Sequence, residues 1–283
     1  MTRPVHVVVV AYHGARELGE ALASVGAGRP VTVVDNSQNE DVGEVCAQRG
    51  ARYVQTIRNL GFAAGANVAL RELLDGDPCD VLLLNPDSTL PEGAVDRLAE
   101  TLAADRGVGA VAPAALVRRD GSSQRVLWPF PSPGQAWLEA LGLGRLSRSP
   151  RFAVGAVLLL RWEALQEVGL LDERFFLYAE ETDWQRRAQA RGWRTTVSES
   201  VTATHAGGSA SDDPSQRERL FYAAQEIYIR KWYGSGGWLS YRLAAIVGAA
   251  VRTVVLRRSR RSGAARRLLI YLRGPCRVAA AGS

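Results

Sequence analysis

The chain has 283 residues, of which 47% are hydrophobic and 23% charged, and this composition excludes a mostly disordered protein. Its three cysteines are far apart and form no CxxC pair, which argues against both a zinc site and a disulfide framework. The net charge of +6 is uneven. Residues 227–283 hold 12 Lys and Arg and no acidic residue, whereas the preceding residues hold 23 basic and 29 acidic ones, so the tail is expected to meet an anionic partner.

Apolar runs and helical patterns alternate along the first part of the chain. The continuous run over 5–10 is typical of a parallel strand buried on both faces, and no basic leader precedes it, so no secretory signal is predicted. This alternation with short links predicts a mostly parallel sheet covered by helices. The strands are expected at 5–10, 31–35, 51–56 and 81–84, with helices at 15–25, 41–50 and 67–74 between them.

The second half continues the α/β pattern and then changes. The sequence predicts a helix at 91–105, a strand at 108–117, a turn at 120–121 and a long irregular loop at 128–150 with helical spacing in 137–143. After the loop it predicts a buried strand at 152–160, helices at 161–169 and 179–192, a strand or loop at 195–204 and a helix at 214–233. In the tail, the apolar stretch 243–251 is too short to span a bilayer, which needs about 20 residues. We therefore predict an interfacial contact, with Trp232, Tyr233, Trp238 and Tyr241 at headgroup depth.

Two predicted strands end on aspartates. Asp35 closes the strand 31–35, and Asp87 follows the strand 81–84 in the sequence Asn-Pro-Asp. Right-handed crossovers bring the carboxyl ends of such strands to one edge of the sheet, which is where ligands bind. Asp87 could hold Mg²⁺ or Mn²⁺ beside a diphosphate, or it could cap the next helix. Asp35 could bind a base or ribose, although by itself the Asp-Asn-Ser tripeptide is more typical of an Asx turn.

The segment RNLGFAAGAN (58–67) carries glycines just before a predicted helix. It matches neither GxGxxG nor a Walker loop, so those nucleotide-binding motifs are excluded. Glycines at a helix N-terminus still allow an anion to approach the backbone closely, and Arg58 could add charge. A compact turn with Phe62 packed inside is an equally good interpretation.

The densest acidic cluster is YAEETDW (178–184). Glu180 and Asp183 are three residues apart and share one helix face, and clustered carboxylates raise each other's pKa, as a general base requires. Acids are also common at helix N-termini, where they stabilise the dipole. His205, in THAGGS, could ligate a metal or contact a diphosphate, but a lone histidine is more often structural.

Six segments, taken in their order along the chain, resemble family 2 glycosyltransferases of the GT-A fold, in particular the bacterial rhamnosyltransferase-like branch. They are VVVVAYHG, VVDNSQ, RNLGFAAGAN, LLLNPDSTL, FAVGAVLLLRWEALQEVGLLDERFFLYAEETDWQRRAQARGW and THAGGS. The resemblance covers about residues 5–235. It implies a Rossmann-like GT-A domain over 1–233, followed by a basic, amphipathic C-terminal extension over 234–283. It also implies an inverting transfer of a sugar, with rhamnose from dTDP-rhamnose favoured and a UDP-sugar as the alternative, to a glycan or polyprenyl-linked acceptor hydroxyl in cell-wall, polysaccharide or glycoconjugate synthesis.

The resemblance also assigns roles to residues. Glu181 stands at the position of the catalytic base, where many relatives have Asp, and Asp183 is the second candidate. Asn85 replaces the first acid of the DxD-type motif, so a divalent Mg²⁺ or Mn²⁺ has fewer charged ligands. The nucleotide-sugar side is assigned to Tyr12, Asp35, Asn36, Arg58, Gly61, Asn85 and Asp87, the acceptor side to Asp172, Glu180 and Trp184, and the metal to Asp87 and His205.

The basic tail fits a lipid-linked acceptor, and predicts a cytoplasmic protein held peripherally at the inner face of the cell membrane, with no nucleic-acid partner. Solvated arginines on a packed pair of helices are the alternative. Two other functions compete. A nucleotidyltransferase would need a Gly-rich, basic signature after the first strand, which AYHGARE lacks. A non-catalytic nucleotide-sugar- or glycan-binding protein retaining the GT-A fold is left open by Asn85 and Glu181.

Overall fold

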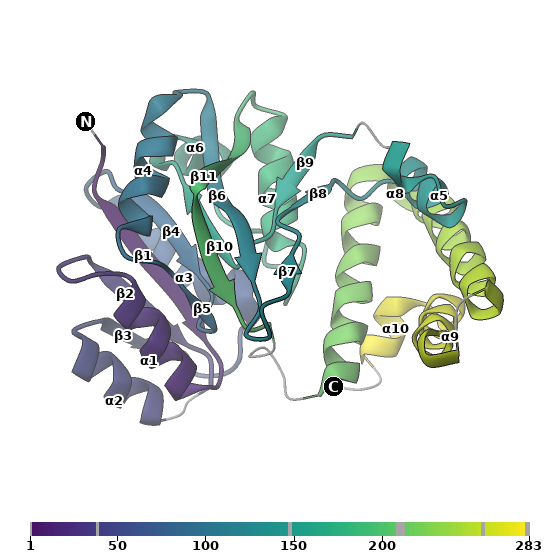
Figure 1. The fold of residues 1–283 in the computed structure, drawn as a ribbon, viewed down its shortest axis with the longest axis horizontal. Coiled ribbons are helices and arrows are strands. Elements are labelled where there is room, and N and C mark those ends of the chain that lie inside the picture. Colours follow the sequence, from purple (N-terminus) through teal and green to yellow (C-terminus); the bar gives the residue numbers. More distant parts are fainter. Residues whose placement is uncertain (1, 38–39, 147–148, 208–212, 256–257, 281–283) are drawn as a thin grey trace. The chain divides into compact units, whose positions relative to one another are not determined.

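The computed structural model describes residues 2–37, 40–146, 149–207, 213–255 and 258–280, and the chain forms two compact units (Figure 1). The first unit comprises residues 1–128, 152–176 and 180–212, and the second comprises 129–151, 177–179 and 213–283. The second unit thus combines the C-terminal tail with the helix at 214–233 and with the 129–151 segment. The expected domain boundary after residue 233 stays a prediction, because compactness alone does not test which part folds independently.

The first unit contains the predicted mixed α/β sheet. Its strand order is β3-β2-β1-β4-β10-β6-β11-β5, with β7 paired to β6. The strands are β1 (Val5–Ala11), β2 (Val31–Asp35), β3 (Arg52–Gln55), β4 (Asp80–Leu84), β5 (Ser88–Thr89), β6 (Val108–Val117), β7 (Ser123–Gln124), β10 (Val157–Leu160) and β11 (Arg194–His205).

Most of the central pairings are parallel. β1 runs parallel to β2 and β4, β2 to β3, and β6 to β11, while β10 is antiparallel to both β4 and β6. The predicted parallel, helix-covered sheet is therefore confirmed in its main part. The run expected as one strand at 152–160 is two strands, β9 (Arg151–Ala153) and β10, separated by a turn; β9 pairs instead with β8 (Leu127–Pro129).

Helices cover both faces of this sheet (Figure 1). On one face lie α1 (Ala15–Ser24), α2 (Glu40–Arg49) and α4 (Ala94–Ala104), and on the other α3 (Gly61–Asp75), α6 (Trp162–Val168) and α7 (Glu180–Gln189). The helix predicted at 67–74 begins six residues earlier, at Gly61. The core consists mainly of valine, leucine and alanine from the strands, as a sheet buried on both faces requires.

The second unit is helical. It contains α5 (Pro133–Ala140), the single turn η1 (Gly144–Leu146), α8 (Pro214–Val255), α9 (Arg258–Arg273) and α10 (Pro275–Ala280). Ser132 caps α5, since its hydroxyl accepts a hydrogen bond from Gln135 N, so part of the segment expected to be irregular is a regular helix. Gly234 interrupts α8 with φ 66° and ψ −169°, a conformation suited to glycine, and divides it into segments 214–233 and 235–255.

By length and composition, Ser215–Val255 is the one helix in the described part of the chain that could cross a membrane. Gly234 breaks it, and 33% of its most apolar window is buried. Two aromatic side chains predicted at headgroup depth lie instead in the interior of the second unit: Trp238 is 4% exposed and Tyr241 9%. Their stacked rings, 6.0 Å apart, pack near Tyr271 of α9, which corrects that part of the prediction.

Candidate functional site

The carboxyl ends of β1, β2, β4, β6 and β11 lie at one edge of the sheet, because β10 is antiparallel to both of its neighbours and so leaves β4 and β6 pointing the same way. The turn that precedes β10 reaches the same edge from the opposite direction. Most of the predicted site residues follow these strand ends. The strand directions, including that of the antiparallel β10, therefore bring these residues to one edge.

Asp87 and His205 are neighbours at this edge. Thr204 and His205 of β11 pair with β5, and His205 Nε2 lies 3.4 Å from Asp87 Oδ1. The other carboxylate oxygen of Asp87 accepts a hydrogen bond from Gly207 N (2.9 Å), and Asp87 O accepts one from Ala206 N (3.0 Å). The structure thus brings together the two residues assigned to a metal.

The His205 ring is oriented by a residue that the sequence did not indicate. Its Nδ1 lies 3.0 Å from Gln124 Oε1, and the tautomer with its proton on Nδ1 would satisfy this acceptor and leave the Nε2 lone pair on the side of Asp87. Burial lowers the pKa of His205, although the negative charge of Asp87 opposes this shift. A neutral imidazole with a fixed tautomer is the form that ligates metals.

The donor set fits a divalent cation only in part. Across the described residues there is no group of three or more His, Cys, Asp and Glu side chains placed to hold an ion. Asp87 and His205 offer one carboxylate and one imidazole. A magnesium-type ion commonly takes one or two carboxylates from the protein and the rest of its ligands from substrate phosphates and water. The two residues therefore fit a cation that shares its coordination with a bound diphosphate.

Asp35 and Asn36 are buried at the end of β2, with exposures of 0% and 3%. Asp35 Oδ1 accepts hydrogen bonds from Ser37 N and Oγ, and Oδ2 accepts one from the Tyr53 hydroxyl (2.9 Å). Burial and this bond raise the pKa of Tyr53 to about 12. Asp35 thus forms the Asx turn that the tripeptide by itself favours, and these bonds limit what its carboxylate can offer to a base.

Asn36 connects β2 to the glycine loop. Its Nδ2 donates to Gly61 O (2.8 Å), and Thr56 Oγ1 donates to its Oδ1 (3.1 Å). Gly61 has φ +80°, and a Cβ there would overlap the carbonyl oxygen of Phe176, which accepts a hydrogen bond from Phe62 N (2.7 Å). Gly61 is therefore required by the packing of the loop, while Arg58 is exposed beside it.

Tyr12 follows β1 at the same edge. It is half-buried, and its ring lies 4.2 Å from that of His13, at a 56° tilt. His13 is exposed. The structure therefore places Tyr12 with the nucleotide-side residues, and its ring is partly open to a ligand.

Glu181 approaches the Asn-Pro-Asp turn through the backbone of the turn before β10. Asn85 N donates to Ala156 O (2.9 Å), and the preceding residue, Gly155, lies against the Glu181 side chain. A Cβ on Gly155 would be 3.1 Å from Glu181 Cγ and 3.2 Å from its Cβ. Asn85 and Glu181 are therefore both in contact with residues 155–156, and the two acids singled out at 87 and 181 reach the same edge of the sheet.

Glu180, which is buried, and Glu181, which is half-buried, form a carboxyl pair at the start of α7. Burial raises the pKa of both groups, and for Glu180 the charge of Glu181 raises it further. In each, Oε2 is enclosed and has no hydrogen-bond partner among the described residues. The two residues before them, Tyr178 (φ 69°) and Ala179 (φ 68°), adopt the left-handed conformation that is rare outside glycine. Such strain often marks a functional segment.

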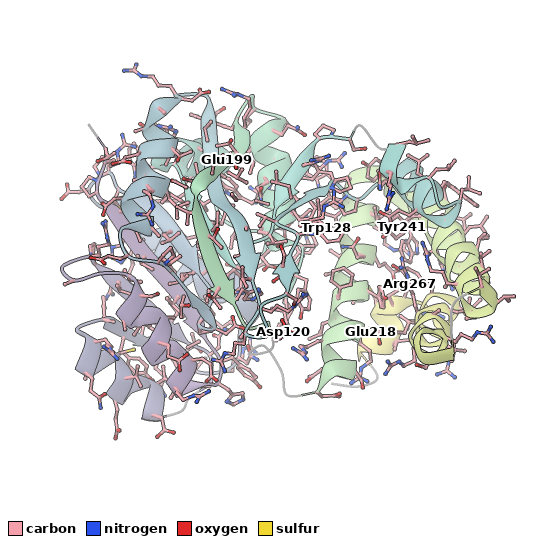
Figure 2. The ribbon with its side chains drawn as sticks, in the orientation of Figure 1. Asp120, Trp128, Glu199, Glu218, Tyr241 and Arg267 are labelled. Atoms are coloured by element: carbon pink, nitrogen blue, oxygen red, sulfur yellow. The ribbon has the colours of Figure 1, made fainter. Side chains whose placement is uncertain are left out.

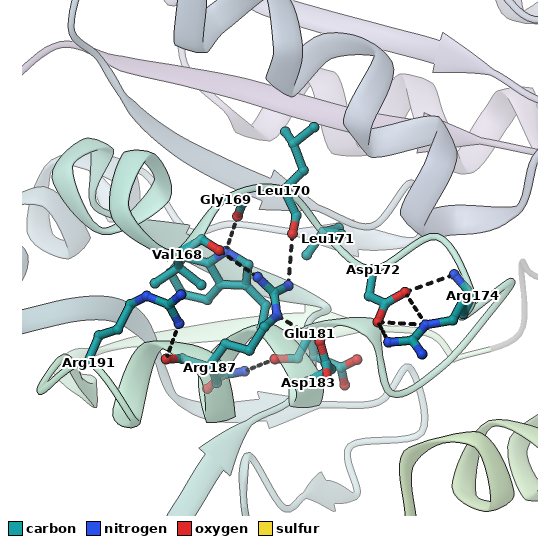
Figure 3. A network of polar contacts seen from close by, with 12 residues as sticks. Val168, Gly169, Leu170, Leu171, Asp172, Arg174, Glu181, Asp183, Arg187 and Arg191 are labelled. Carbon is teal, nitrogen blue, oxygen red and sulfur yellow. Dashed lines mark hydrogen bonds and ion pairs between the residues drawn. The ribbon is translucent and has the colours of Figure 1, made fainter. Parts of the chain in front are cut away.

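Asp183 has a structural partner (Figure 3). It is fully buried, and its Oδ2 accepts a hydrogen bond from Arg187 Nε (2.9 Å). The same guanidinium donates to Val168 O (2.7 Å) and Leu170 O (2.8 Å), so it joins α7 to the segment after α6. In the described part of the chain no such ion pair involves Glu181, which is therefore the better candidate for a base.

Two residues assigned to the acceptor side have other surroundings. Trp184 is 1% exposed, and its indole donates to Gly169 O (2.9 Å), so it is a core residue and we do not propose it as an acceptor contact. Asp172 is half-buried and bound by the Arg174 side chain through Nε (2.9 Å) and Nη2 (2.6 Å), as Figure 3 shows.

Gln185 is a positioning residue that the sequence did not indicate. It exchanges two hydrogen bonds with the backbone of Ala153 (2.8 and 2.7 Å), and its Nε2 also donates to Glu181 O (3.1 Å). It fixes the start of α7 against β9. The spacing of Gln185 four residues after Glu181 places both on one helix face and could have indicated this role. An isolated glutamine in a helix is usually solvated, however, so the spacing alone did not single it out.

The chain is similar to several known proteins. A family model described as "Glycosyl transferase family group 2" matches residues 81–276. The N-acetylglucosaminyl-diphospho-decaprenol L-rhamnosyltransferase of Mycobacterium tuberculosis (strain CDC 1551 / Oshkosh) is 29% identical over 301 residues, which cover 92% of this chain and 97% of the relative. The low-salt glycan biosynthesis hexosyltransferase Agl10 of Haloferax volcanii is 23% identical and covers 79% of this chain and 71% of the relative.

A solved structure shares the fold. The mannosyltransferase PcManGT from Pyrobaculum calidifontis, in complex with GDP-Man and Mn²⁺, superposes with a TM-score of 0.59 at 16% identity, covering 98% of this chain and 83% of that one. At this identity the likeness shows the fold alone, which is the GT-A fold that the sequence predicted.

Proposed function

The chain belongs to glycosyl transferase family group 2, and from this premise we propose that it transfers a sugar, with inversion, from a nucleoside diphosphate to a hydroxyl of a lipid-linked glycan. The enzyme class follows from the family. The stereochemistry, the donor and the acceptor are the proposal. The mycobacterial relative, whose name states a rhamnosyl transfer to N-acetylglucosaminyl-diphospho-decaprenol, supports rhamnose from dTDP-rhamnose and a polyprenyl-diphosphate-linked acceptor.

The observation that carries the proposal is the contact between the turn before β10 and both acidic segments. Ala156 O is bonded to Asn85 N, and Gly155 lies against Glu181. A carboxylate at each side of residues 155–156 is what a single displacement needs: one group meets the leaving diphosphate, and the other takes the proton of the incoming hydroxyl.

Glu181 is the proposed general base. Its raised pKa, caused by burial, makes the carboxylate more basic than an exposed glutamate and so a better proton acceptor. Because Oε2 is enclosed, the acceptor hydroxyl can reach that oxygen only if the side chain turns or its cover moves. Glu180, whose carboxyl is still more strongly biased to the protonated form, would leave the pair with a single negative charge.

Asp87 and His205 are the proposed ligands of a divalent cation, which when bound would offset the charge of the departing diphosphate. The chain's own contribution is to hold the Asp87 carboxylate by Gly207 N and the His205 ring by Gln124. On the nucleotide side, we propose Tyr12, Arg58 and the backbone around Gly61, with Asp35 and Asn36 fixing the shape of the pocket floor rather than its charge.

We also propose that the protein works in the cytoplasm at the inner face of the membrane, where a lipid-linked acceptor would present its sugar. The basic second unit, with 17 Lys and Arg against 4 Asp and Glu, supports this location.

The test combines donor binding with transfer. Calorimetry against dTDP-rhamnose, UDP-sugars and GDP-sugars, with and without Mn²⁺, identifies the donor, and NMR of the product gives the anomeric configuration. Glu181→Gln should abolish transfer and leave donor binding intact. Glu199→Gln, on the exposed surface of β11 (Figure 2), is the matched control and should retain both. Unchanged transfer by Glu181→Gln, or retention of configuration, would overturn the mechanism.

A further inference from the structure

The segment 235–255 of α8 is apolar on its outer face as well as its inner one. Toward the inside it contributes Trp238, Tyr241, Ala244, Ala245 and Ala249, which are all buried. At 100° per residue, a second set of positions falls on the opposite side of the helix. We define the outer stripe as Leu239, Leu243, Ile246, Val247, Ala250 and Val254.

The outer stripe is open at both of its ends. Leu239 is 67% exposed, Leu243 50% and Val254 73%, while the middle positions are half-buried. A helix on a water-facing surface normally carries polar residues there. Of the 14 exposed large hydrophobic side chains in the described ranges, 11 lie in the second unit, which has about a third of the residues, so this exposure is concentrated rather than scattered.

Side chains of α9 adjoin the outer stripe. Arg242, between Leu239 and Leu243, donates to Tyr271 O (2.7 Å) and Leu272 O (2.9 Å), which brings Leu272, itself 52% exposed, beside one end. Arg273, next in the chain, is exposed. At the other end, the exposed Arg261 donates to Val254 O (3.0 Å). Exposed arginines therefore lie near both ends of an apolar strip.

The charge of the second unit distinguishes between possible occupants. It carries 17 Lys and Arg against 4 Asp and Glu, whereas the first unit carries 18 against 25. Two copies of so basic a surface would repel each other, so a homodimer through the outer stripe is disfavoured. An anionic bilayer complements both features, since it offers hydrocarbon to the leucines and phosphates to the arginines.

The inner face of the same helix excludes a spanning arrangement. Tyr241 and Tyr271 pack against each other inside the unit, and the Arg267 guanidinium lies 5.7 Å from the Tyr271 ring. Figure 2 labels Tyr241 and Arg267 in this unit. A helix whose inner side is covered by an arginine-bearing helix can lie in the interface but cannot pass through the hydrocarbon core alone.

We infer that the outer stripe is a monotopic membrane-insertion surface, which lies parallel to an anionic bilayer with its leucines and valines at the headgroup–acyl boundary and with Arg261 and Arg273 at the lipid phosphates. This rests on the proposed function in one respect, that a lipid-linked acceptor requires the enzyme at a membrane. The inference goes beyond the proposed function because it assigns the membrane contact to one face of one helix, α8.

The test uses the full chain and co-sedimentation with vesicles of phosphatidylcholine, alone or mixed with phosphatidylglycerol. The double variant Leu239→Gln, Leu243→Gln should bind mixed vesicles at least about tenfold more weakly, because it removes two exposed leucines that the bilayer would bury. The control, Leu141→Gln with Leu146→Gln, removes two equally exposed leucines of the same unit and should bind as the unchanged chain does. Circular dichroism verifies that both variants are folded.

Two further measurements keep the outcomes apart. Arg261→Gln with Arg273→Gln should reduce the preference for phosphatidylglycerol while retaining weak binding to phosphatidylcholine. Vesicle binding by the stripe variant equal to that of the unchanged chain, or a change of its oligomeric mass in place of lost binding, would overturn the inference. Sugar transfer to a water-soluble acceptor distinguishes failure of this inference from failure of the proposed function. The variant Leu239→Gln, Leu243→Gln should keep this transfer, whereas Glu181→Gln should lose the transfer and still bind vesicles.

Discussion

Gly155→Ala tests whether the position of Glu181 controls the reaction. The new Cβ would lie 3.1 Å from Glu181 Cγ and 3.2 Å from its Cβ, whereas relaxed carbon–carbon contacts are about 3.5–4.0 Å. The side chain must therefore shift by roughly half an ångström. A displacement of about 1 Å in a reacting group can cost about 100-fold in rate, so we expect kcat to fall about 10- to 100-fold. The KM for the donor should not change, because the contact is on the acceptor side.

The assay is steady-state transfer, with donor binding by calorimetry and thermal unfolding measured in parallel. Gly155 does not have a positive φ, so alanine can adopt its backbone conformation, and the loss of stability should stay near 1 kcal/mol. Gly134→Ala is the control, since among the described residues no atom beyond its chain neighbours and its own helix backbone lies within 4 Å of its Cβ position. If Gly155→Ala kept full kcat, the contact with Glu181 would have no role in catalysis, and the assignment of the base would fail with it.

Three other substitutions test the framework. Gly61→Ala should destabilise the chain by roughly 3 kcal/mol or more in urea unfolding, because φ is +80° and the Cβ overlaps the Phe176 carbonyl. Arg187→Met leaves the Asp183 carboxylate buried without this cation and should cost about 3–5 kcal/mol by the same measurement. Glu180→Gln should stabilise the folded chain by about 1–2 kcal/mol at about pH 8 and by little at about pH 4, as measured by thermal unfolding. Burial raises the pKa of Glu180, so the unchanged chain loses stability as the pH rises from the ordinary glutamate pKa to the raised one, and the glutamine variant does not.

The position of Asp87 could be predicted from the sequence because it depends only on the strand that precedes it and on the parallel direction of the neighbouring strands. A buried apolar run over 81–84 must be a strand, and parallel strands share one edge, so whatever follows it lies where ligands bind. The direction of β10 could not be predicted in the same way. Its valine and three leucines are equally apolar in either direction, and only the pairing with β4 and β6 shows that it is antiparallel.

Aromatic residues were harder to place. Trp184, Trp238 and Tyr241 are amphipathic side chains that occur in cores, at membranes and in sugar sites, and their helical spacing is compatible with each. Their contacts in the folded chain show where they lie. The Trp184 indole donates to Gly169 O in the core, and the stacked Trp238 and Tyr241 rings of α8 pack near α9. The apolar face that remains open is instead aliphatic, and the run 243–251 had already indicated it without showing which of its residues point outward.

The site is assembled mainly through backbone atoms, and this explains why its motifs are short and widely separated. Ala206 N and Gly207 N hold Asp87, Ala156 O holds Asn85 N, and Gly61 O holds Asn36. A main-chain contact constrains the path of the chain but not the neighbouring side chains, apart from the glycines that let the strands approach. The segments between the motifs are thus free to vary while the edge of the sheet keeps its geometry. An identity of 29% to a relative matched over 92% of this chain is compatible with that kind of construction.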